Sequence, residues 1–152
     1  MLNFLAKIED AFCAVALLVT SIVLFVNVVL RYVFSASTSW AEELIRYLMI
    51  WITFIGGSVC VRKGAHIRMD FLLSMVPKRV GDIITRIVLL ISAGFCAALF
   101  VYGCQLVSFT IELEQTSPAM EIPMWIPYLA IPIGSALMVL RFLQAALGKG
   151  AK

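Results

Sequence analysis

Uncharged and mostly apolar positions gather into four long runs along the chain. The runs cover 11–30, 47–61, 87–111 and 122–140, and none of them contains Asp, Glu, Lys or Arg. About 20 apolar residues in an α-helix cross a hydrocarbon layer of roughly 30 Å. Three runs reach or nearly reach that length, and the second does so only if its helix also takes in the charged residues before it. The pattern predicts an all-α integral membrane protein with four transmembrane helices.

We place the transmembrane helices at about 11–31, 40–61, 83–111 and 121–147, within one membrane domain that covers 1–152. Between the second and third helices, apolar residues recur at the i, i+3, i+4, i+7 spacing of a helix from Met69 to Val76. This spacing predicts a short interfacial amphipathic helix at about 68–77 on the cytoplasmic side, ended by Pro77. In the fourth helix, Pro123, Pro127 and Pro132 remove backbone donors and should bend or tighten its outer half.

Composition supports the membrane assignment. Charged residues make up 14% of the chain, against roughly 25% in average globular proteins, and 62% of residues are hydrophobic. A cleaved signal peptide is an alternative for the first run, with the small residues at 35–37 as a cleavage site. The residues before that run are not net positive, however, and the run is longer than the usual 7–15 residues of such a peptide. We therefore predict a transmembrane helix there.

The basic residues predict the orientation of the helices, because Lys and Arg of short loops collect on the cytoplasmic side. With the N-terminus inside, ten of the twelve basic residues are cytoplasmic, the inside carries +6 and the outside −3, which sums to the net +3 of the chain. Both termini are then cytoplasmic. The basic charge thus indicates topology and contact with anionic membrane lipid, not nucleic acid. It includes a cytoplasmic basic loop formed by Arg62, Lys63, Arg68, Lys78 and Arg79.

Charges at the start of the second helix have a structural interpretation. Glu42 and Glu43 fall in its first turn, where the helix dipole favours acids, and Arg46 follows at the i+4 and i+3 spacings that allow an ion pair. One acid is left over. Arg31, at the outer end of the first helix, can take it and join the first two helices, or that acid can face a partner protein.

Candidate chemistry is sparse. Cys13, Cys60, Cys96 and Cys104 all lie in apolar runs without paired spacing, and the lone His66 has no second ligand nearby. We expect no disulfide, no metal and no cofactor, and no enzyme. A four-helix drug exporter needs a membrane-embedded carboxylate in its first helix, where 11–30 contains no acid. A quinone-linked thiol oxidase needs cysteine pairs in its outer loops, and a haem-anchoring subunit needs histidines within helices. The sequence offers none of these.

Several motifs in order resemble one known family. LRYVF (30–34), SWAEELIRYLMIWITFIGG (39–57), RKGAHIRMDFL (62–72) and QTSPAMEIPMWIPYLAIPIGSALM (115–138) are similar to the small membrane subunit of TRAP transporters, the DctQ-like family. The resemblance implies a protein of the bacterial inner membrane that works with a large permease subunit and, transiently, a periplasmic solute-binding protein. Such systems import organic acids of the C4-dicarboxylate or sialic acid type with a sodium gradient. The small subunit is expected to brace the large one.

An acidic outer surface offers a candidate docking face for the binding protein, since complementary charge steers association. Its members are Trp40, Glu42, Glu43, Glu112, Glu114 and Glu121. The same acids also serve simply to keep positive charge off the outside, so both interpretations stay open. The alternative to the whole functional assignment is a membrane anchor subunit of another inner-membrane complex.

Overall fold

Four long helices dominate the structure, a computed structural model that describes residues 2–36, 38–64 and 78–147. The elements in chain order are α1 (Leu2–Val33), α2 (Ser39–Gly64), α4 (Lys78–Glu112), the single turn α5 (Trp125–Tyr128) and α6 (Ala130–Ala146). The spans long and apolar enough to cross a membrane are Leu5–Val33, Ser39–Lys63, Ile83–Glu112 and Trp125–Ala146. The all-α membrane fold with four spanning helices is confirmed. The predicted interfacial helix at 68–77 lies outside the described residues.

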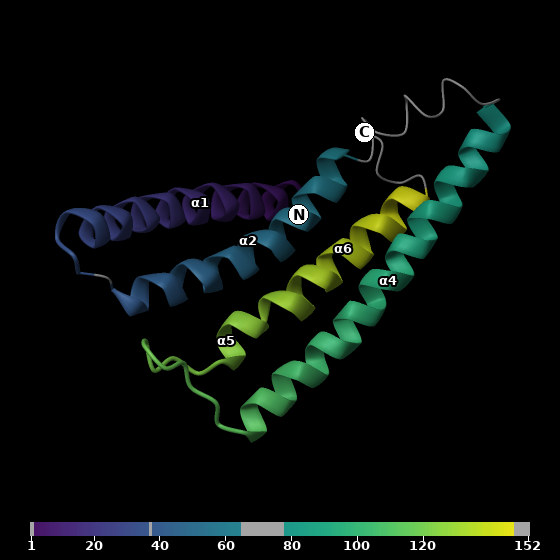
Figure 1. The fold of residues 1–152 in the computed structure, drawn as a ribbon. Coiled ribbons are helices and arrows are strands. Elements are labelled where there is room, and N and C mark those ends of the chain that lie inside the picture. The colour runs from purple at the N-terminus through teal and green to yellow at the C-terminus, as the bar shows by residue number, and fades with distance from the viewer. Residues whose placement is uncertain (1, 37, 65–77, 148–152) are drawn as a thin grey trace.

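The long helices form a row rather than a closed bundle (Figure 1). α1 packs against α2, α2 against α6, and α6 against α4, whereas α1 and α4 do not touch. Successive helices run in opposite directions, so the α1–α2 connection and the α4–α5 connection lie at one end of the row. The N-terminus and the end of α6 lie at the other end. We call these the outer end and the inner end.

A row of four helices leaves most apolar side chains without a partner inside the chain. In an 18-residue apolar stretch of each span, only 11% of the residues are buried in α1, and 28% in the more central fourth span. Large side chains such as Phe25 on α1 and Phe95 on α4 are 70% and 65% exposed. A soluble protein would not expose so many large apolar groups, but lipid or another membrane protein can cover them.

Small residues allow close approach between the neighbouring helices of the row. Gly134 of α6 lies directly against Phe54 of α2, and Gly103 of α4 lies against Ile131 and Pro132 of α6. Helix pairs in membranes gain their packing energy from such contacts, since lipid tails are as apolar as the side chains they replace. Glycines thus fix both interfaces of α6.

Substituting Gly134 with Ala tests this contact. The added Cβ would lie 2.5 Å from Cβ of Phe54 and 2.8 Å from its carbonyl oxygen, so α2 and α6 must separate. Overpacking of this kind costs about 1–3 kcal/mol. The control is Gly94→Ala in α4, where an added Cβ meets nothing within 4 Å. Denaturation with SDS in mixed micelles should reveal destabilisation by Gly134→Ala alone, and equal midpoints for the two variants would contradict the contact.

The fourth spanning helix begins later than predicted, at Trp125 rather than about 121. Residues before it belong to the outer connection, in which Met124 N donates to Gln115 O (2.9 Å) and Thr116 pairs with Pro123 in an isolated β-bridge. The helix is then divided at Leu129, between α5 and α6. Pro132 lacks the N–H that would bond to the carbonyl of residue 128, which accounts for an irregular outer half.

Candidate functional site

The connection between α4 and α5, residues 113–124, is a folded loop that we call the outer loop. Ser117 N donates to Ile122 O (2.9 Å), and Glu121 N donates to Ser117 O (3.1 Å). Glu114 and Glu121 adopt left-handed backbone conformations, with φ of 45° and 52°. Non-glycine residues rarely adopt this conformation unless surrounding contacts hold them there. The loop therefore has a defined conformation. Contacts other than its own backbone hydrogen bonds must help to hold the two left-handed residues.

Glu43 of α2 supplies the missing support for the outer loop. Its carboxylate accepts hydrogen bonds from Ser117 Oγ (2.7 Å), Ala119 N (3.2 Å) and Met120 N (3.1 Å). Glu43 is 8% exposed and Ser117 is 2% exposed. Hydrogen bonds to an ionised acceptor are stronger than neutral ones, and more so away from water. The first turn of α2 is thus attached to a loop more than seventy residues further along the chain.

The other members of the predicted docking face lie at the outer end, and their side chains are exposed. They are Trp40, Glu42, Glu112, Glu114 and Glu121. Glu43 differs from them, because its carboxylate is already engaged within the chain. It is therefore not available to a partner protein.

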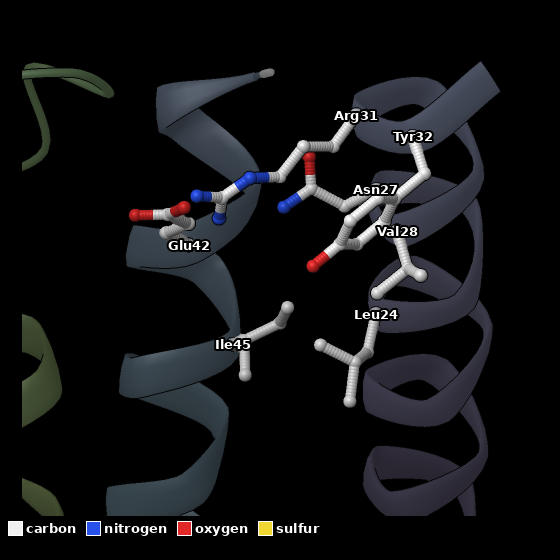
Figure 2. Close-up of a pocket in the computed structure, with 7 residues that line it drawn as sticks. All are labelled: Leu24, Asn27, Val28, Arg31, Tyr32, Glu42 and Ile45. Atoms are coloured by element: carbon white, nitrogen blue, oxygen red, sulfur yellow. The ribbon is translucent and has the colours of Figure 1, made fainter. Parts of the chain in front are cut away.

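The predicted ion pairs of Arg31 and Arg46 do not appear among the pairs that the described residues form. Those pairs all lie at the inner end. Arg31 and Glu42 nevertheless line the same cavity between α1 and α2 (Figure 2), and Arg46 is exposed on α2. Their pairing stays a prediction. At the outer end, Thr38 N, just before α2, donates to Oδ1 of the buried Asn27 of α1 (3.3 Å).

A charged cluster at the inner end joins three helices, and the sequence does not predict it. Glu9 of α1 pairs with Arg141 of α6, and their side chains are 5% and 15% exposed. Next to it, Asp10 of α1 pairs with Arg62 and, at 3.2 Å, with Lys63 of α2. These pairs attach α1 to α2, its neighbour in the row, and to α6, the next helix after α2 in the row.

Arg62 and Lys63 were predicted in the cytoplasmic basic loop, but they belong to the last turns of α2. This is a correction, and its cause is the helix extending to Gly64, three residues beyond the predicted end. Lys78 and Arg79 open α4, and Arg68 lies outside the described residues. The only available signal for the cluster was the presence of acids, Glu9 and Asp10, beside an apolar run.

Hydroxyl groups within the spans donate hydrogen bonds to backbone carbonyl groups of their own helices. Thr20, Thr53 and Ser135 each donate to the carbonyl four residues earlier, at 2.7, 2.7 and 2.6 Å. Ser58 is fully buried, and its hydroxyl has no hydrogen-bond partner among the described residues. Within 2–36, 38–64 and 78–147, no group of three His, Cys, Asp or Glu residues is placed to hold a metal ion. The arrangement suits helix packing and attachment rather than bond-making chemistry.

Four spanning helices, a folded outer loop and an ion-paired inner end together define a multi-pass membrane protein. Residues 20–149 match the family described as tripartite ATP-independent periplasmic transporters, DctQ component. The chain belongs to this family of transporter permease components, and it is accordingly a multi-pass inner-membrane protein and not an enzyme.

Relatives from several bacteria differ in size and in the solute that they are named for. The C4-dicarboxylate TRAP transporter small permease protein DctQ of Rhodobacter capsulatus is 38% identical over 115 residues, which are 72% of this chain and 48% of that protein. The isethionate TRAP transporter permease protein DctMQ of Oleidesulfovibrio alaskensis is 28% identical over 95% of this chain but 24% of its own length. The sialic acid TRAP transporter permease protein SiaT of Haemophilus influenzae is 29% identical over 95% of this chain and 23% of its own. The chain thus spans about half, or less, of the length of these relatives.

Proposed function

We propose that this chain is the small permease subunit of a transporter that imports organic acids of the C4-dicarboxylate or sialic acid type by sodium-coupled secondary transport. Its partners in this proposal are a large permease subunit, which carries the solute, and a periplasmic solute-binding protein, which docks transiently. The task of the chain itself is to brace the large subunit. Both termini then lie in the cytoplasm, and the outer loop faces the periplasm.

The observation that carries this proposal is the open row of helices. A solute path needs polar groups at mid-depth that are enclosed by several helices. In this chain α1 and α4 do not meet, so the helices enclose no central space, and three of the mid-span hydroxyls are bound to their own backbone. This supports assigning the path for the solute to another polypeptide.

The lengths of the relatives support a permease partner. In the isethionate and sialic acid permease proteins, the region similar to this chain is about a quarter of a much longer polypeptide. The broad exposed faces of the row provide an apolar surface for such a partner. We also propose that Trp40, Glu42, Glu112, Glu114 and Glu121 form the docking face for the binding protein, and we leave Glu43 out because it is engaged within the chain.

Reconstitution in vesicles tests the proposal. We expect vesicles with this chain alone to take up neither labelled succinate nor labelled sialic acid under an inward sodium gradient. Vesicles with both permease subunits and the binding protein should take up one of them, whereas vesicles with the large subunit alone should be much slower. In the complete system, Glu112→Lys combined with Glu114→Lys should raise the concentration of binding protein needed for half-maximal uptake. Solute uptake by this chain alone would overturn the bracing role.

A further inference from the structure

A cavity of about 290 Å³ opens between the outer ends of α1 and α2 (Figure 2). The cavity is close to the lower end of the usual size range of ligand pockets, roughly 300–1,000 Å³. It therefore fits part of a larger molecule rather than a whole cofactor. Of its lining residues, the proposed function uses only Glu42, as a member of the docking face.

Polarity changes along the depth of the cavity. Leu24 and Val28 of α1 and Ile45 of α2 form its apolar wall, whereas Arg31 and Glu42 lie nearer the outer surface. From Leu24 to Arg31 is about 10 Å along the helix axis. Both charged residues lie near the outer ends of their membrane spans, Leu5–Val33 and Ser39–Lys63. The cavity is thus apolar at the depth of the acyl chains of a phospholipid and charged at the depth of its headgroup.

Two opposite charges stand on opposite walls of the cavity. Figure 2 shows the Arg31 side chain reaching from α1 toward the Glu42 carboxylate on α2. Both are exposed, and in the described part of the chain neither takes part in an ion pair within 4 Å. Each can therefore accept a charged group of a ligand. Arg is suited to a phosphate, which it binds through several N–H donors, and a carboxylate is suited to a primary ammonium.

We propose that this cavity binds the headgroup of a zwitterionic aminophospholipid, phosphatidylethanolamine, from the outer leaflet. The phosphate lies on Arg31, the ammonium on Glu42, and the upper acyl chain along Leu24, Val28 and Ile45. α1 stands at the edge of the row, and Leu24 is 49% exposed, so a lipid can reach the cavity from the side. Phosphatidylglycerol has no ammonium for Glu42, and the trimethylated nitrogen of phosphatidylcholine has no N–H to donate to it.

Native mass spectrometry of the purified full chain, with each of the three phospholipids added separately, tests this site. The wild-type chain should retain phosphatidylethanolamine about fivefold better than the other two, which is the effect of one partly exposed ion pair. Glu42→Gln should remove that preference, and Arg31→Gln should lower retention of all three lipids. Glu112→Gln is the matched control, since it removes an exposed outer carboxylate from α4, at the far edge of the row. Circular dichroism and gel filtration of each variant establish that it is folded.

Two results would overturn the site. One is equal retention of the three lipids by folded wild-type chain, unchanged in Glu42→Gln and Arg31→Gln. The other is retention by the isolated chain that disappears in the complex with the large permease, which would mean that a protein side chain occupies the cavity instead. Neither result bears on the bracing role, which the uptake experiment tests separately.

Discussion

Replacing Arg141 with Met should be among the most destabilising single substitutions in this chain. Arg141 neutralises Glu9, whose side chain is 5% exposed at the inner end of the row. Removing one partner of a buried ion pair costs about 3–5 kcal/mol, because the other charge is left in a poorly solvated place. The pair is also the described ion pair that joins α1 to α6, so its loss weakens the attachment of the first helix. The midpoint of SDS denaturation in mixed micelles measures the effect.

Two further variants separate charge from packing at this position. Glu9→Gln together with Arg141→Met removes both charges and should recover most of the loss, because replacing a whole buried pair is often close to neutral. Arg141→Lys keeps the charge but has a single ammonium in place of the guanidinium fork, and we expect an intermediate midpoint. If the double variant is as unstable as the sum of the two single variants, Glu9 and Arg141 are not coupled and the stabilising pair is refuted.

Glu43→Gln should release the outer loop while leaving the helices in place. An amide keeps one acceptor oxygen but turns an N–H2 donor toward Ser117 Oγ or the backbone amides of Ala119 and Met120, which are donors themselves. Hydrogen exchange followed by mass spectrometry should detect this locally. We expect exchange of the Ala119 and Met120 amides to rise on the order of a hundredfold, as several charge-assisted hydrogen bonds are lost together.

The neighbouring Glu42→Gln is the control for this experiment. It removes the same charge from the same helix turn, but Glu42 is exposed and does not contact the loop through any hydrogen bond of the described residues. Loop exchange in Glu42→Gln should match the wild type. Similar acceleration in both variants would mean that charge at the start of α2, and not the bonds of Glu43, holds the loop.

The four spanning helices were predictable because the bilayer leaves few options for the backbone. Uncharged runs of sufficient length must satisfy their own N–H and C=O groups, and a helix does so within one segment. Proline positions also predicted the irregular outer half of the fourth helix. The order of helices in the row was not predictable, since it depends on close contacts such as Gly134 with Phe54, and a small residue alone does not reveal which helix it faces.

Patterns of neighbouring residues along the sequence predict only part of the roles of Glu43 and Arg141. For Glu43, the helix dipole and a nearby Arg46 offered a sufficient explanation, although its partners lie 74 to 77 positions away. Arg141 is one of the ten basic residues that the charge balance assigns to the cytoplasmic side, although it meets Glu9 across 132 positions. Spacing rules describe neighbours along one helix, so they cannot detect pairs that form only after distant helices come together.

The absence of contact between α1 and α4 has a mechanical consequence for any assembly that includes this chain. A closed bundle would add a compact cylinder beside its partner, whereas a row lengthens the boundary that the assembly shares with the bilayer. Tilting a membrane protein deforms the surrounding lipid, and the energetic penalty grows with that boundary because each stretch must match the hydrocarbon thickness. If the chain borders a large permease subunit as proposed, we expect its long boundary to oppose rocking of that subunit without entering the path of the solute.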